Sequence, residues 1–67
     1  ALPDPPLRFV GLIGDLGVFE RIAPQGESFR ARRGQVIDGI WRIESMGRDG
    51  VDCVDLRYGM TKHLKLL

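Results

Sequence analysis

Short runs in which apolar and polar residues alternate make up most of the chain, and glycine-containing links separate them. In residues 28–33 (SFRARR), Phe29 and Ala31 fall on one side of an extended segment, and Arg30 and Arg32 fall on the other. Alternation with a period of two is typical of a strand that buries one face. Tight links between antiparallel strands often need the positive φ that glycine tolerates. The pattern therefore predicts antiparallel strands joined by short turns.

Six short extended segments predict an all-β fold, a small antiparallel β-sandwich or barrel. Their expected bounds are 7–14, 18–23, 28–33, 40–46, 51–58 and 61–67. Residues 34–39 are expected to form a connecting turn, from which Val36 and Ile37 plug the core. Helix competes only near residues 21–23 and 60–66, and each stretch is too short to stand alone.

The first segment, residues 7–14 (LRFVGLIG), carries more apolar residues than one face of one strand can bury. Two explanations stay open. The segment is either a central strand buried on both faces, or an edge strand whose outer face and free amides are covered by a partner strand. The second explanation predicts that this strand is a docking element.

The predicted partner site combines this strand with the densest basic cluster of the chain. Arg8, Val10 and Leu12 are the expected contacts on the first strand. Arg30 and Arg32 share one face of the third segment and are expected to add an electrostatic rim that sets register more than affinity. The alternative for these arginines is a solvated face neutralised by carboxylates on neighbouring strands.

Size and charge limit the classes of function. Sixty-seven residues form one small domain that buries only about 60% of the surface of its unfolded chain. Ten lysines and arginines against nine acidic residues give a net charge of +1, which provides no strong field for nucleic acid or an anionic membrane. Residues 1–6 (ALPDPP) are expected to end a Pro-rich linker, and residues 7–67 to form the domain.

The sequence shows no catalytic set and no cluster of metal ligands. His63, the only histidine, has no nucleophile or further ligand at a suitable spacing, so an exposed position on a strand is expected. Cys53, the only cysteine, is expected to be a buried structural thiol, and Trp41 is expected in the core. No glycine spacing matches a phosphate-binding loop. We therefore expect a protein that is not an enzyme and has no cofactor, metal ion or small-molecule substrate.

Taken together, the motifs resemble the periplasmic domain shared by the inner-membrane C subunit of type II secretion systems and the P protein of type IV pilus assembly. A strand like LRFVGLIG opens the domain in that family. A segment like ESFRARRGQVIDGIWRIESMG follows, with its Gly-x-x-(Ile/Leu)-x-Gly link, and GRDGVDCVDLRYGMTKHLKLL resembles the closing hairpin with its alternating leucine tail. The resemblance covers residues 7–67 and rests on the order and spacing of these motifs.

The resemblance implies a β-sandwich of two three-stranded antiparallel sheets, held in the periplasm by an inner-membrane anchor outside this chain. The implied function is to link the inner-membrane platform to the outer-membrane secretin by binding the N-terminal domains of the secretin, with other platform subunits as further partners. The secretion and pilus branches both fit. A different class also stays open, an SH3-like barrel that binds RNA or ribosomal protein through Arg30, Arg32, Arg33 and Lys62.

Overall fold

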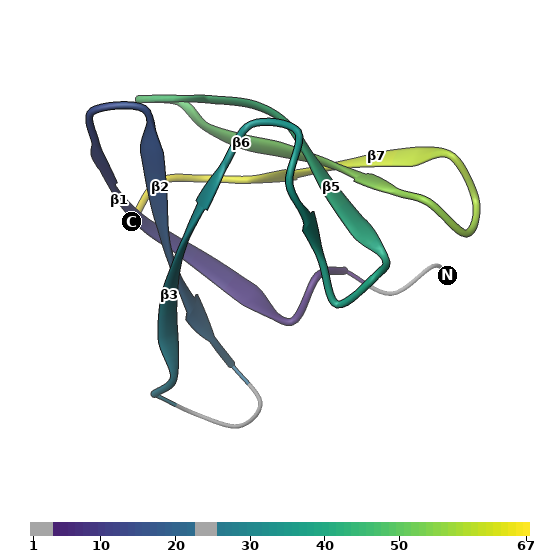
Figure 1. Cartoon of the computed structure of the whole chain (residues 1–67), viewed down its shortest axis with the longest axis horizontal. Helices are drawn as coiled ribbons and strands as arrows, with labels where there is room; N and C mark the ends of the chain where they lie inside the picture. Colours follow the sequence, from purple (N-terminus) through teal and green to yellow (C-terminus); the bar gives the residue numbers. More distant parts are fainter. Residues whose placement is uncertain (1–3, 23–25) are drawn as a thin grey trace.

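The strands of the described chain form two antiparallel sheets (Figure 1). The computed structural model describes residues 4–22 and 26–67. The strands are β1 (Leu7–Ile13), β2 (Leu16–Arg21), β3 (Ser28–Arg32), β4 (Val36–Ile37), β5 (Trp41–Gly47), β6 (Gly50–Asp55) and β7 (Met60–Leu64). The first sheet has the order β1-β2-β3 and the second the order β4-β5-β6-β7. The described residues contain no helix, so the predicted all-β class is confirmed.

The second sheet has a fourth strand that the sequence prediction lacked. Residues 36–37, expected to form only a turn, pair with β5 as the short strand β4. Residues 38–40 connect the two strands. Asp38 and Gly39 have φ values of 57° and 68°, and the Ile40 N–H donates to the Ile37 carbonyl. Two consecutive positive φ angles define a type I′ turn, for which Asp-Gly is a preferred sequence. Residues 4–22 and 26–67 therefore form seven strands, where the sequence predicted six.

Neighbouring residues of β4 point to opposite sides, which corrects one expectation about the core. Ile37 is buried, but Val36 is 41% exposed, because successive side chains of a strand alternate between the faces of its sheet. Only Ile37 therefore plugs the core. Trp41 is buried as predicted.

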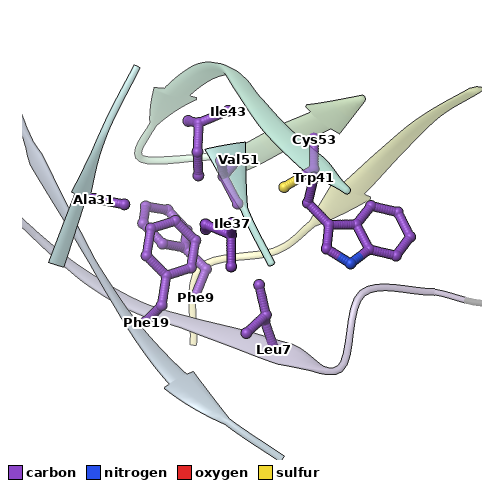
Figure 2. Close-up of a cluster of buried hydrophobic side chains, with 9 residues drawn as sticks. All are labelled: Leu7, Phe9, Phe19, Ala31, Ile37, Trp41, Ile43, Val51 and Cys53. Atoms are coloured by element: carbon purple, nitrogen blue, oxygen red, sulfur yellow. The ribbon is translucent and has the colours of Figure 1, made fainter. Parts of the chain in front are cut away.

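Buried side chains from both sheets meet in one core (Figure 2). The first sheet contributes Phe9 and Phe19, which are fully buried and whose ring centroids lie 5.2 Å apart. The second sheet contributes Ile43, Val51 and Cys53, which are equally inaccessible. Burial of this kind stabilises a small domain by roughly 1.5–3 kcal/mol for each large apolar side chain.

Strand β1 lies at the edge of the first sheet, so it is not a central strand buried on both faces. The C-terminal segment crosses from the second sheet to this edge (Figure 1). Leu66 forms a parallel bridge with Phe9, and the Leu67 N–H donates to the Phe9 carbonyl at 3.0 Å. The chain therefore covers part of the β1 edge with its own residues.

The segment expected to be a linker is described only from residue 4 onward. Residues 1–3 lie outside the described residues, as do residues 23–25, which hold the predicted end of the second strand and its turn. Pro5 is buried, and the Pro6 carbonyl accepts a hydrogen bond from the Ile22 N–H at 3.0 Å. The last residues of the expected linker therefore pack on the domain.

We expect replacement of Gly50 by alanine to destabilise the domain strongly. Gly50 has a φ of 130°, and a Cβ there would overlap the Leu64 carbonyl oxygen and lie 2.8 Å from His63 Nε2. Backbone strain and displacement of β7 should lower the free energy of unfolding by at least about 2 kcal/mol. The matched control is Gly47→Ala in the same turn, where a Cβ meets nothing within 4 Å. Urea unfolding followed by Trp41 fluorescence measures both variants, and equal midpoints would contradict this role of Gly50.

Candidate protein-docking face

The outer face of the first sheet has an apolar centre. In β2, Gly17 and Phe19 point into the core and are buried. Leu16 and Val18 therefore face outward, where both are half-buried. This strand is central in its sheet, so neighbouring strands flank both outward side chains.

A β-bulge in β1 decides which of its residues join this face. The register passes from Phe9 opposite Phe19 directly to Gly11 opposite Val18, which leaves Val10 as the extra residue. A bulge shifts the alternation of the strand by one position. Val10 itself lies on the outer side, where it is 36% exposed.

Strict alternation from Phe9 would place Leu12 on the outer side and Ile13 on the inner side. Beyond the bulge the two positions are exchanged. Leu12 is opposite the inward-facing Gly17 and packs against the core. Ile13 is opposite the outward-facing Leu16 and is 55% exposed. Leu12 therefore does not share a face with the other two predicted contacts of β1, and Ile13 takes its place.

Arginines border the apolar centre on both neighbouring strands. Arg8 of β1 lies opposite Glu20 and forms an ion pair with it at 3.0 Å. On β3, Arg30 lies opposite Val18 and Arg32 lies opposite Leu16. Both are exposed, and neither forms an ion pair with a carboxylate of residues 4–22 or 26–67. Their charges therefore remain free to meet a partner.

The structure thus brings four of the five predicted contacts onto one face and adds three residues that sequence reasoning missed. The four are Arg8, Val10, Arg30 and Arg32. The three added residues are Ile13, Leu16 and Val18. A sequence signal for part of this set exists, because Gly14-Asp15 between apolar residues is a two-residue hairpin sequence. The sequence predicted a longer turn, residues 14–17, and therefore placed Leu16 outside a strand, whereas β2 begins at Leu16.

The outer face of the second sheet differs in that its charges satisfy one another. The ion pair between Arg42 and Glu44 has a distance of 3.3 Å. Asp52 binds the His63 ring at 2.6 Å and accepts a hydrogen bond from the Ser45 hydroxyl at 3.0 Å. A face with internally paired charges is typical of a surface that stays in water. Val36 is also exposed on the second sheet, so the described outer face of the first sheet is distinguished by the unpaired Arg30 and Arg32 beside its apolar side chains.

Ser45, Asp52 and His63 are the residue types of a hydrolytic triad, but their connections differ from one. The Ser45 hydroxyl donates to the Asp52 carboxylate and not to the imidazole. His63 Nδ1 lies 2.6 Å from the other carboxylate oxygen, and Nε2 lies 3.0 Å from the Asp49 carbonyl. A general base needs a ring nitrogen facing the nucleophile. This cluster therefore joins β5, β6 and β7 and activates no hydroxyl.

Cys53 is buried, as the sequence predicted. Burial, together with the charge of the neighbouring Asp52, raises the pKa of the Cys53 thiol to about 11. At neutral pH the thiol is protonated, so it lacks the thiolate that acts as nucleophile or metal ligand.

The described chain lacks two further features, a cluster of metal ligands and a membrane-spanning helix. No group of three or more His, Cys, Asp or Glu residues within 4–22 and 26–67 is placed to hold a metal ion. Over the same ranges, no helix has the length and apolar character needed to cross a membrane.

Comparison with protein-family models, with curated proteins and with solved structures found no match for this chain. Membership of the secretion and pilus family therefore rests on the order of the sequence motifs alone and is a proposal.

We expect the stability of the domain to fall as pH rises past the ordinary titration range of histidine. Asp52 and the Asp49 carbonyl can only accept hydrogen bonds, so His63 satisfies both only as an imidazolium. The Asp52 hydrogen bond, and next that of Asp49, raise the folded-state pKa of His63 above its ordinary 6.5. A raised pKa gives stability that is complete below the unfolded pKa and is lost as pH rises through the folded pKa.

Urea midpoints measured between pH 5.5 and 8 test this linkage, because at higher pH ionisation of the Cys53 thiol in the unfolded chain would lower the stability of both proteins. The wild-type midpoint should fall across the upper part of that range, and the fall should be absent in His63→Gln. An identical pH profile for the two proteins would show that the imidazolium does not stabilise the fold.

Proposed function

We propose that this chain is a non-enzymatic protein-interaction domain that docks through the outer face of its first sheet. One observation carries the proposal. The exposed apolar residues Val10 and Ile13 share that face with Arg30 and Arg32, which form no ion pair with a described carboxylate. Exposed apolar side chains with a polar rim mark protein-interaction sites. Apolar contacts would supply affinity, and the arginines would orient the partner.

The partner that we propose is the N-terminal domain of an outer-membrane secretin. The domain would then sit in the periplasm, tethered to the inner membrane by an anchor outside this chain, as the link in a type II secretion or type IV pilus machine. Other inner-membrane platform subunits are proposed as further partners. The order of the sequence motifs supports this assignment, and the two-sheet all-β fold agrees with the kind of domain that the resemblance implies.

Contact through the sheet face fits the structure better than addition of a strand along β1. The Phe9 carbonyl on that edge already accepts the Leu67 N–H, and Leu66 bridges to Phe9. A partner strand would first have to displace this tail. The outer face needs no rearrangement, so its side chains are already in place for binding.

The distribution of cations and aromatics favours protein over RNA. Lys62 belongs to β7 of the second sheet and pairs with Asp4 at 3.4 Å, so it does not extend the arginine cluster on β3. Phe9, Phe19 and Phe29 of the first sheet contact one another along its inner side, with the Phe19 and Phe29 rings stacked and the Phe9 ring tilted against that of Phe19. Binding of single-stranded nucleic acid uses exposed aromatic side chains, and the described outer face of the first sheet offers none.

A three-stranded face of a 67-residue domain offers limited contact area. Specific stable interfaces bury about 800 Å² on each partner, which is close to a fifth of the 4335 Å² of accessible surface of this chain. We therefore expect weak binding by one copy, strengthened by avidity when several copies meet a ring of secretin subunits.

A negative charge among the outward apolar side chains of β1 should weaken binding without unfolding the domain. Val10→Asp and Ile13→Asp each bury an unpaired carboxylate against the partner, so each should weaken binding at least about tenfold. The matched control is Val36→Asp, which alters a residue of similar exposure on the second sheet. A pull-down with the secretin N-terminal domain measures binding, and thermal unfolding checks the fold. Retained binding by folded Val10→Asp and Ile13→Asp would overturn the docking face.

A further inference from the structure

A hollow of about 450 Å³ opens beside the docking face, at the end of the first sheet where the β1–β2 turn approaches β5. Its lining comes from both sheets and consists of Leu12, Gly14, Asp15, Arg32, Arg33 and Met46. Arg32 belongs to both the hollow and the docking face. A partner that covers the face therefore also reaches the hollow.

The floor of the hollow is apolar and adaptable. Leu12 and Met46 are half-buried and pack against the core. Gly17 makes room for the Met46 side chain, because a Cβ at Gly17 would lie 2.5 Å from the Met46 sulfur and 2.8 Å from the Phe19 ring. An unbranched thioether fits itself to differently shaped apolar groups. This floor suits an inserted apolar side chain better than a fully charged one.

The mouth of the hollow is basic, and its backbone is fixed. Gln35 binds the Arg32 backbone twice, through its side-chain oxygen at 3.2 Å and its own N–H at 3.1 Å. The Gly34 N–H donates to the Ile43 carbonyl at 2.7 Å, which holds the chain after Arg33 against the second sheet. Neither arginine forms an ion pair with a described carboxylate. Asp15 adds one negative charge to the lining, so the positive charge is in excess.

We infer that this hollow takes an anchor segment of the partner protein, in which an apolar side chain is followed by one or two carboxylates. The inference rests on the proposed function and deepens it by naming the chemistry of the partner. The apolar side chain contacts Leu12 and Met46, and the carboxylates bind the guanidinium groups of Arg32 and Arg33. Guanidinium and carboxylate form strong bidentate hydrogen bonds. A segment with basic residues at these positions would be rejected, since it would repel the arginines.

Peptide binding to the isolated chain tests the inference without the partner. The probes are a short blocked peptide with one leucine followed by two aspartates, and the same peptide with asparagines instead. Amide NMR should show saturable shifts at Leu12, Arg33 and Met46 with the acidic peptide, and at least tenfold weaker binding of the amide peptide. Equal binding of the two peptides, or shifts scattered away from the hollow, would overturn the inference.

Two charge reversals separate this inference from the proposed function. Arg33→Glu should weaken binding of the secretin N-terminal domain at least fivefold. Arg48→Glu, which changes an exposed arginine of the β5–β6 turn that does not line the hollow, should not. If the two variants bind equally well while Ile13→Asp loses binding, the hollow inference fails and the docking face stands. If Arg33→Glu alone loses binding, the hollow stands and the proposed docking face fails.

Discussion

The contact between the Phe9 and Phe19 rings fixes which side of the first sheet is buried. The two residues face each other in the β1–β2 register and are fully inaccessible. Each buried phenylalanine contributes roughly 1.5–3 kcal/mol, which is a large share of the marginal stability of so small a domain. The bulge follows directly after Phe9, so the same contact determines that Val10 and Ile13 face outward. A slip of one residue would exchange the buried and exposed sides of β1.

Charged residues divide between holding the fold together and remaining available to a partner. Arg21 of β2 makes two hydrogen bonds of 2.8 Å to Asp38 in the β4–β5 turn, which joins the two sheets. The Arg21 hydrogen bond lowers the pKa of Asp38, so this carboxylate stays ionised well into the acidic range. Arg30 and Arg32 have no such partner among the described residues. Although the net charge is only +1, positive charge is in local excess beside the apolar outer face of the first sheet. We expect a partner to bind at that surface.

Alternation in the sequence predicted the inward side chains wherever polar residues mark the outer face. It correctly placed Trp41 in the core and Cys53 as a buried thiol. It failed in residues 7–13, because apolar residues occur on both faces of that run and the sequence does not show which set is buried. The bulge and the exposed Ile13 follow only from the pairing of β1 with β2. The link between His63 and Asp52 was also beyond prediction, since it depends on the register of β6 against β7. The proposed docking face combines residues from three strands, and no periodicity in the sequence marks such a set. It can be recognised only when the pairing of β1, β2 and β3 is known.

Methyl cross-saturation from the secretin N-terminal domain to this chain tests the central claim most directly. The methyl groups of the proposed docking face should lose intensity, namely those of Val10, Ile13, Leu16 and Val18. The methyl groups of Val36 and Val54, which belong to the second sheet, should keep theirs. Loss of intensity confined to the second sheet would contradict docking through the outer face of the first.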